Sequence, residues 1–408
     1  MIFTLKGSNM KRSKTTSFKA IATAAILVTA IFSAFVLSSC KKKDSGNVLE
    51  GISTYASYDT SYITKLADYK NITVTNDLSV TDEDVRNTYL ETLESIMARC
   101  DFTAEEPVID PIFSHLVECT GGRKVTEKGD IICFDYAGKL DGEPLEGGTA
   151  QYTTSILGAG YFIPGFEDSI IGHETGTDFD IFVTFPESYP QNTDLQNREV
   201  CFSIYVHYIL PAITDDSVAV LLEYEKTTFD ETKTDESKTF VPQYSTAAEY
   251  VEHIKEQMRT EAKLNFNSNL EGHIMYELYS GSEFSNVPQA EIDNFKKSVE
   301  ETAAGYGVST EVYLYYAYGG IATQEEYDEL ARFQVCTRGI VAAVVQSEKM
   351  TVTRDELNTE AASLAQEYGY DNAEALISAV GIENVCNAIL AEKAVNLLIA
   401  NTTVDEKR

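Results

Sequence analysis

Apolar and polar side chains alternate along the chain between residues 125 and 209. In the segment DIICFDYAG, the side chains of Ile132, Phe134 and Tyr136 point to one side of an extended strand. Two further segments alternate in the same way, through Phe179, Ile181, Val183 and Phe185 and through Phe202, Ile204, Val206 and Tyr208. This period of two predicts an antiparallel sheet with one packed face and one solvent-exposed face. The pair Asp141-Gly142 predicts a hairpin turn, and a short helix is expected at about 165–171.

Other segments carry the 3.6-residue period of helices. Residues 81–98 open with Thr81 and three acidic residues, which is typical of a helix start. After Pro211 two apolar stripes follow, through Leu357, Ala361, Leu364, Ala365 and Tyr368 and through Val385, Ile389, Leu390, Ala394, Leu397 and Leu398. Helix-start pairs occur at Thr246 and Glu249, Thr323 and Glu326, and Thr353 and Glu356. Residues 227–240 are charged and unpatterned, which predicts a loop. The fold class is therefore α+β, with a β-rich domain followed by a helical domain.

The first forty residues differ from the rest of the chain. A basic stretch from Lys11 to Lys19 precedes the uncharged, apolar residues 20–37. This order is typical of an export signal, and a transmembrane anchor is the alternative interpretation. The next residues, LSSC at 37–40, resemble the bacterial lipobox. The resemblance implies removal of residues 1–39, lipidation of Cys40 and a tether over 40–62. The expected location is the extracytoplasmic face of the cell membrane, held there by the lipid.

Composition narrows the classes of partner and cofactor. The net charge of −32 over 408 residues argues against nucleic acid, because phosphate binding needs clustered Lys and Arg. Besides Cys40 the chain has six cysteines, none in a zinc-site spacing. We expect these to be free thiols, although pairing between distant cysteines stays open at this point. No cofactor is expected.

Several motifs occur together within about 85 residues: LGAGYFIPGFED at 157–168, IGHETG at 171–176 and VTFPESY at 183–189. With the preceding GD and DYAG they resemble the FKBP-type peptidyl-prolyl isomerase domain, in the version carried by bacterial trigger factor. Residues 66–85, 287–295 and 352–376 resemble flanking parts of trigger factor. The basic ribosome-docking module of that family is not found, so the ribosome is not an expected partner. The domains expected from this resemblance are 63–120 (linker region with a helix), 121–211 (isomerase) and 212–408 (helical client-binding domain).

The resemblance also implies a fold and a site. In the family a bent antiparallel sheet wraps around a short helix, and an apolar pocket between them binds the prolyl peptide. The positions that match pocket residues are Tyr136, Leu145, Glu146, Phe162, Ile163, Phe166, Tyr189 and Phe202. In the family the residue at Ile163 offers its backbone N–H to the substrate carbonyl. Leu145 and Thr153 stand where aromatic residues are usual, which thins the expected pocket wall.

The expected function is peptidyl-prolyl cis-trans isomerase and folding chaperone, with unfolded or nascent exported polypeptides containing X–Pro bonds as partners. X–Pro rotation needs no acid, base or nucleophile, which suits residues 159–189, because this segment holds no credible nucleophile, metal cluster or basic patch. The alternative is a catalytically weak holdase that uses the same fold only for binding. An adhesin or solute-binding lipoprotein is a third interpretation. In the helical domain, Tyr313, Tyr315, Tyr316 and Tyr318 are expected to contribute to client binding, because aromatic side chains adapt to varied partners.

Overall fold

The computed structural model describes residues 54–189, 192–235, 237–321 and 323–408. The apolar segment at 20–37 and Cys40 lie outside the described residues. The described chain packs into two compact units. The first comprises residues 79–260, and the second comprises residues 54–78 together with 261–408. Packing thus divides the chain at 79 and 261, whereas the sequence interpretation placed boundaries at 63, 121 and 212.

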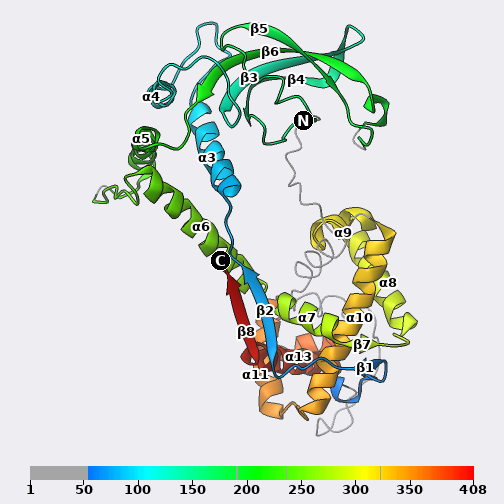
Figure 1. Cartoon of the computed structure of the whole chain (residues 1–408). Coiled ribbons are helices and arrows are strands. Elements are labelled where there is room, and N and C mark those ends of the chain that lie inside the picture. The colour runs from blue at the N-terminus through cyan, green and yellow to red at the C-terminus, as the bar shows by residue number, and fades with distance from the viewer. Residues whose placement is uncertain (1–53, 190–191, 236, 322) are drawn as a thin grey trace. The chain divides into compact units, whose positions relative to one another are not determined.

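A four-stranded antiparallel sheet forms the centre of the first unit (Figure 1). Its strands, in spatial order, are β4 (Glu143–Ile156), β3 (Ile131–Leu140), β6 (Glu199–Leu210) and β5 (Asp178–Thr184). The hairpin between β3 and β4 closes with Leu140 opposite Glu143. Asp141 and Gly142 have φ angles of 53° and 89°, which are the positive values that a tight type I′ turn requires. The hairpin prediction is confirmed.

The two faces of this sheet carry separate apolar clusters. Ile132, Phe134 and Tyr136 lie in the cluster on one face, whereas Ile131 and Cys133 pack in the cluster on the other face. The strand alternation is therefore as predicted. The prediction of a solvent-exposed second face is wrong, because helices cover much of it. These helices are α3 (Asp82–Met97), α4 (Pro111–Glu118) and α5 (Asp215–Thr232).

Tyr208 lies on the opposite face from the one that its sequence period predicts. In the pairing of β3 with β6, Cys133 is opposite Tyr208 but Phe134 is opposite Val206. His207 is thus an extra residue in β6, and a bulge of this kind turns the following side chain to the other face. The ring of Tyr208 packs edge-on against Phe113 of α4, with centroids 5.2 Å apart.

Two other local predictions differ from the structure. The short helix expected at about 165–171 is a run of turns over 164–172. Within it the N–H of Ser169 donates to the backbone carbonyl of Gly165, and the N–H of Ile170 donates to the backbone carbonyl of Glu167, so no regular helical ladder forms.

The charged segment at 227–240 is not a loop throughout, because α5 continues to Thr232. Its last turn is held by an ion pair of Lys226 with Asp230 at 2.6 Å.

The second unit is mostly helical. Its helices are α7 (Leu270–Gly281), α8 (Gln289–Gly305), α9 (Thr310–Ala317), α10 (Gln324–Ser347), α11 (Arg354–Glu367), α12 (Ala373–Val380) and α13 (Ile382–Ala400), and α6 (Ala247–Ser268) contains the boundary between the units. Two short strand pairs are present, β1 (Ile63–Lys65) with β7 (Glu283–Phe284) and the parallel β2 (Ile72–Asp77) with β8 (Thr402–Lys407). Single turns of 3-10 helix occur at Tyr55–Ser57 and Thr193–Leu195. The helix starts predicted at Thr81, Thr323 and Thr353 are confirmed, and each of the three carries a capping box.

Two further expectations concern cysteines and membrane spans. The six cysteines within the described residues are free thiols, as expected. Taken one at a time, none of the described helices has the length and apolar character to cross a membrane. The pair α12 and α13, bent by 103°, meets that test by length and composition only.

Candidate functional site

Aromatic side chains from three parts of the first unit meet between the sheet and the turns at 158–172. Tyr136 comes from β3, Phe202 from β6, and Phe162 and Phe166 from the turns. The rings of Phe162 and Phe166 stack with centroids 4.5 Å apart. Phe202 meets Phe166 edge-on at 5.1 Å, and Tyr136 meets Phe166 edge-on at 5.8 Å. The structure therefore brings these four predicted residues into one group, which we call the aromatic cluster.

The other predicted site residues lie at different depths. Ile163 and Tyr189 are buried in the same apolar core as the aromatic cluster. Leu145 is partly buried and packs against that core, whereas Glu146 is exposed and belongs to the surface. The backbone carbonyl of Ile163 accepts a hydrogen bond from the N–H of Phe166, so Ile163 lies within the turn that carries Phe162 and Phe166.

Burial of the aromatic cluster is nearly complete. Phe166 and Phe202 are each 1% exposed, so the surroundings of these rings are apolar and dry. Burial raises the pKa of the Tyr136 hydroxyl above 10.0, because the phenolate would lose its hydration. The hydroxyl therefore stays protonated at neutral pH, and the site presents apolar surface rather than charge. Within the described residues no group of three His, Cys, Asp or Glu side chains is arranged to hold a metal ion.

Two residues that contribute to the site are not among those predicted from the sequence. Phe134 of β3 is fully buried, and its ring centroid lies 5.8 Å from that of Phe162 and 6.3 Å from that of Phe166. The strand alternation had placed Phe134 on the correct face, so this signal was available. Glu167 is a buried carboxylate that holds the turn before Phe162. Its only sequence signal is an acidic residue within an apolar stretch.

The carboxylate of Glu167 organises the backbone of the 158–161 turn. It accepts hydrogen bonds from the N–H groups of Gly158 at 3.0 Å, Gly160 at 2.7 Å and Tyr161 at 2.7 Å. Ser155 donates a longer bond at 3.4 Å. A buried carboxylate is tolerated only when its oxygens are bonded in this way. Glu167 therefore fixes the turn from which Phe162 and Ile163 enter the core.

The four tyrosines predicted to bind clients do not share one environment. Tyr316 is 82% exposed and Tyr315 is 58% exposed, and both lie on α9. Tyr318 is only 8% exposed, since its ring packs edge-on against Phe295 of α8 at 6.4 Å. Tyr313 is partly buried against the same core. The prediction that Tyr318 contributes to a surface is therefore wrong.

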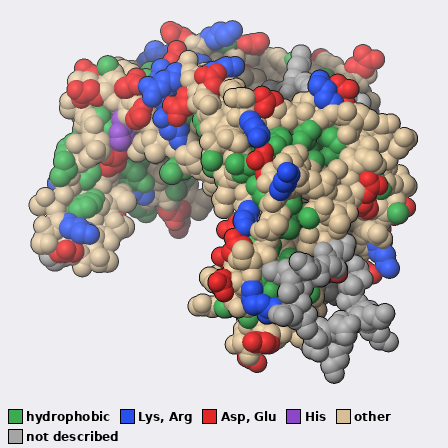
Figure 2. Space-filling view, turned by 90° about the horizontal axis from the view of Figure 1, so that it is seen from below, with side chains coloured by type: hydrophobic (Ala, Val, Ile, Leu, Met, Phe, Trp, Pro, Cys, Tyr) green, Lys and Arg blue, Asp and Glu red, His purple; other side chains and the backbone are tan. Residues whose placement is uncertain are grey.

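Other exposed apolar side chains lie close to Tyr315 and Tyr316 in the sequence. We call this group the aromatic patch, and it comprises Tyr306, Val308, Val312, Tyr315 and Tyr316. Tyr306 precedes α9, and its ring stacks on that of Tyr313 at 6.1 Å. Figure 2 shows that acidic side chains are spread among apolar and polar ones over the face that it displays. Large exposed apolar side chains gathered in one segment are typical of interaction surfaces.

Comparison with known proteins identifies two families. A model of the FKBP-type peptidyl-prolyl cis-trans isomerase matches residues 122–207, and a model of the bacterial trigger factor C-terminus matches residues 246–400. Trigger factor from Limosilactobacillus reuteri is 28% identical over 82% of this chain and 70% of its own length. Trigger factor from Bacillus subtilis is 28% identical over 83% of this chain and 72% of its own length. Trigger factor from Ligilactobacillus salivarius is 30% identical over 69% of this chain and 62% of its own length.

One solved structure is also similar. It is described as promiscuous substrate recognition in folding and assembly activities of the trigger factor chaperone. It covers 82% of this chain and 72% of its own chain, with 16% sequence identity and a TM-score of 0.28.

These relatives correct the expected location. The prediction of a lipid-anchored protein on the extracytoplasmic face of the cell membrane is wrong, because the relatives are cytoplasmic trigger factors and not lipid-anchored membrane proteins. The prediction that excludes the ribosome contrasts with the ribosome docking of trigger factors and gains no support from them. The fold prediction is confirmed, since an FKBP-like sheet region is followed by a helical region. The chain is a trigger factor-like protein with an FKBP-type peptidyl-prolyl isomerase domain.

Proposed function

We propose that this protein isomerises X–Pro bonds in unfolded polypeptides and that the aromatic cluster is the site of the reaction. The observation that carries the proposal is the convergence of Tyr136, Phe162, Phe166 and Phe202 from separate segments into one dry, aromatic group. These are the positions that match the pocket of the isomerase family. The family match over residues 122–207 supports the same assignment.

The chemistry follows from the resonance of the amide bond. Rotation about an X–Pro bond has a barrier of about 20 kcal/mol, because the C–N bond loses its partial double-bond character. The twisted amide is less polar at nitrogen than the planar one. An apolar pocket therefore disfavours the planar ground state more than the twisted transition state, and the difference lowers the barrier. The N–H of Ile163 would hold the carbonyl that precedes the rotating bond, and no proton would be transferred.

The aromatic patch is proposed as a second contact for clients. Tyr315 and Tyr316 offer rings that are both apolar and able to form hydrogen bonds, which suits binding to varied unfolded segments. The net charge of −32 should favour clients that are rich in Lys and Arg. Holding a client at this patch would keep its X–Pro bonds available to the isomerase domain.

One observation favours the alternative of a weakly active holdase. Phe166 is 1% exposed and its ring contacts Phe202 at 5.1 Å, so a prolyl ring cannot lie on Phe166 until a neighbouring side chain moves. The cost of that movement would lower turnover without affecting client binding elsewhere. A measurement of turnover separates the two functions.

The test is a protease-free isomerisation assay with the full chain and a prolyl peptide. We expect Phe166→Leu to reduce kcat/KM by about tenfold or more, because the aromatic platform is lost while most of the volume remains. Phe182→Leu is the matched control, since Phe182 is 63% exposed on β5 and should leave kcat/KM unchanged. Tyr136→Phe should also be active, because it retains the ring. Thermal unfolding of each variant checks the fold. A wild-type protein with no turnover would support the holdase and reject the isomerase.

A further inference from the structure

The carboxylate of Asp135 connects irregularities in the two strands that flank β3. Between Phe134 and Tyr136 the pairing of β3 with β4 shifts by one residue, so β4 has two residues opposite Asp135. In β6, His207 is likewise an extra residue. Oδ1 of Asp135 accepts a hydrogen bond from the N–H of Tyr152 at 2.7 Å and lies 2.8 Å from Nε2 of His207. One carboxylate oxygen therefore contacts a β-bulge on each side of β3.

The backbone of Tyr152 adopts an uncommon conformation at the bulge in β4. Its φ angle is 48°, in the left-handed region that bulky side chains rarely occupy. Such a conformation persists only where the surroundings hold it, and it is concentrated at functional sites. Here the N–H is bound to Asp135, and the ring stacks on that of His207 with centroids 4.2 Å apart. The contacts with Asp135 and His207 therefore hold this bulge.

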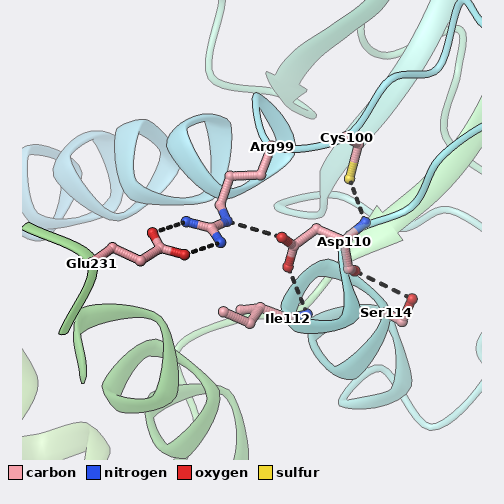
Figure 3. Close-up of polar contacts among 6 residues, drawn as sticks. All are labelled: Arg99, Cys100, Asp110, Ile112, Ser114 and Glu231. Carbon is pink, nitrogen blue, oxygen red and sulfur yellow. Dashed lines mark hydrogen bonds and ion pairs between the residues drawn. The ribbon is translucent and has the colours of Figure 1, made fainter. Parts of the chain in front are cut away.

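The ring of Tyr152 also stacks on Phe102, with centroids 4.5 Å apart. Phe102 lies in the segment after α3, which Arg99 holds in place. The guanidinium of Arg99 donates to Asp110 at 2.9 Å and to both carboxylate oxygens of Glu231 at 3.1 and 3.2 Å (Figure 3). Because this segment is fixed to α4 and α5, the ring of Tyr152 has little freedom to move. A change in the contacts between the two bulges therefore acts on β3.

The contact between His207 and Asp135 depends on the charge of the imidazole. Nε2 of His207 is buried, and among the described residues it makes no hydrogen bond of normal geometry. The 2.8 Å approach to Oδ1 of Asp135 is therefore most favourable when the imidazole carries a proton and the two charges attract. The side chains are 15% and 26% exposed, so solvent screens this attraction only in part. Histidine is the side chain that commonly changes its charge between about pH 5 and 8.

Other titratable groups surround His207 and Tyr152 on the neighbouring elements. They are Cys133 of β3, Tyr205 and Tyr208 of β6, Asp178 of β5 opposite Tyr205, Glu94 of α3 beside Thr154, and Cys100 after α3. Helix α4 packs against Tyr208 through the uncharged ring of Phe113. Burial raises the pKa of Tyr152 and Tyr208 above 10.0 and that of Cys133 to about 12, so these groups stay neutral. The charged members of the set are carboxylates, so a proton on His207 adds an attraction.

Asp135 lies in β3 between two residues that reach the proposed isomerase site. Phe134 and Tyr136 project to the opposite face of the sheet, where their rings contact those of Phe162 and Phe166. A shift of β3 at Asp135 would therefore move both rings relative to Phe162 and Phe166. Burial raises the pKa of Tyr136 above 10.0, so the aromatic cluster itself holds no group that titrates near neutral pH. A pH dependence of turnover would have to originate outside the cluster.

We propose that Asp135 and His207 are positioning residues for the isomerase site, and that a proton on His207 tightens the two bulges and raises turnover. The proposal rests on the function proposed for the aromatic cluster and adds a regulation of that site by pH. In the protonated state, β3 holds Phe134 and Tyr136 in the geometry that binds the twisted amide. In the neutral state this geometry is held less firmly, so the transition state is bound less well.

The first experiment measures kcat/KM of the full chain between about pH 5.5 and 8, with a blocked prolyl peptide that has no titratable group. We expect kcat/KM to fall by about three- to fivefold in one step as the pH rises. His207→Phe keeps a flat ring beside Tyr152 without the charge, so its kcat/KM should be low at every pH. His207→Arg keeps a planar cation at every pH and should retain the high value at pH 8. A wild-type profile without a step overturns the proposal.

Matched variants of two other histidines show whether the step belongs to His207. His115 also lies beside a carboxylate, with its Nδ1 3.1 Å from Glu223, and His173 stacks on Phe179 in the isomerase domain. His115→Phe and His173→Phe should both keep the step in kcat/KM. Loss of the step in either of them, or a step that persists in His207→Phe, overturns the assignment of His207.

Asp135→Asn tests the other partner of the contact. The variant keeps an oxygen that can accept from the N–H of Tyr152 and removes the negative charge that faces His207. We expect it to lose the step in kcat/KM, and a step that persists contradicts the role of Asp135. Thermal unfolding of each variant checks the fold, and the wild-type profile decides the proposal even where a variant does not fold.

Nuclear magnetic resonance of the full chain, labelled at His and Tyr, separates this proposal from the isomerase proposal, because it does not require turnover. The signal absent in His207→Phe reports the protonation of His207, and the signal absent in Tyr136→Phe reports the surroundings of Tyr136. A Tyr136 signal that shifts with the midpoint of His207, in a protein without turnover, supports the positioning role and rejects the isomerase. Turnover without a pH step retains the isomerase and rejects the positioning role. A Tyr136 signal that does not follow His207 also overturns it.

Discussion

The carboxylate of Glu167 accepts a hydrogen bond from the backbone N–H of Tyr161 at 2.7 Å. The same carboxylate holds the N–H groups of Gly158 and Gly160, and it is 5% exposed. One side chain thus replaces water as the acceptor for three backbone amides of the turn. The turn leads directly to Phe162 and Ile163, so the position of the aromatic cluster depends on this carboxylate.

Substitution of Glu167 should therefore destabilise the first unit. Glu167→Gln keeps the shape but places an NH₂ group where backbone N–H donors converge, which leaves buried donors without acceptors. We expect a loss of about 2 kcal/mol in the free energy of unfolding of this unit. Urea unfolding followed by tyrosine fluorescence measures it. Asp168→Asn, at the exposed neighbouring position, is the control and should change the value by less than about 0.5 kcal/mol. Equal stability of Glu167→Gln and the wild type would contradict the assigned role.

The strand faces of the site could be read from the sequence, but several other features could not. Alternation placed Phe134 and Tyr136 correctly, because the pleat of a strand forces period two. It misplaced Tyr208, because the bulge at His207 adds a residue that no alternation reveals. Tyr318 looks like its exposed neighbours in the sequence, and only its contact with Phe295 shows that it is buried.

The same limit applies to surfaces built from distant segments. The covered second face of the sheet needs α3, α4 and α5, which come from both sides of the strands in the sequence. The segment that follows α3 likewise depends on a contact between distant residues, because Arg99 donates a hydrogen bond to Glu231, 132 positions away. The spacing of apolar residues describes one helix or strand at a time, so it cannot predict which elements contact one another.

The aromatic patch should contribute to chaperone activity. The double variant Tyr315→Ser and Tyr316→Ser removes two exposed rings without disturbing the core. We expect the full-length variant to suppress aggregation of a refolding client several-fold less well than the wild type, as loss of aromatic contacts does at other interfaces. Light scattering of the client measures it. Phe182→Ser, an equally exposed aromatic position in the first unit, should retain full suppression.

The dependence of aggregation suppression on salt concentration is a second test of client binding at the aromatic patch. If the acidic surface favours basic clients, suppression should weaken as ionic strength rises, because salt screens exposed charges. Suppression that is independent of salt would remove the electrostatic part of the proposal. Suppression that is unchanged in the double variant would remove the aromatic part.

The ion pair of Glu356 with Lys393 predicts a pH dependence in the second unit. The two groups lie 2.6 Å apart, and the bond to Lys393, with those to Thr353, lowers the pKa of Glu356 to about 2. An unfolded Glu has a pKa of about 4.3. The lowered pKa therefore adds stability above about pH 4, and this contribution is lost as the pH falls toward 2.

Glu356→Gln tests this dependence while retaining a residue that can cap α11. Because Glu356 is partly exposed, we expect only about 0.5 kcal/mol of destabilisation at pH 7. The difference between variant and wild type in urea midpoint should shrink as the pH falls from 4 toward 2. Glu367→Gln, exposed at the other end of α11, should show no such trend. A midpoint difference that does not vary with pH would show that the charge of Glu356 is not responsible.

Gly339 of α10 packs directly against Tyr62 in the core of the second unit. A Cβ at position 339 would lie 2.1 Å from the hydroxyl oxygen of Tyr62 and 2.8 Å from its Cζ. The hydroxyl cannot easily move away, because it donates to the carbonyl of Val335 at 3.0 Å in the core. Alanine is the better helix former by about 1 kcal/mol, but a clash of this size in a packed core costs more than that gain.

Gly339→Ala should therefore destabilise the second unit by about 1–3 kcal/mol, the usual range for overpacking. The loss should be smaller in a Tyr62→Phe background, because that change removes the atom closest to the new methyl group, although the ring still crowds it. A double-mutant cycle from urea unfolding gives the coupling between the two positions. Gly305→Ala is the control, since a Cβ there, at the last residue of α8, meets nothing within 4 Å, and it should leave stability unchanged or raise it. If the cost of Gly339→Ala is the same with Tyr62 and with Phe at position 62, the hydroxyl is not what excludes a side chain from position 339.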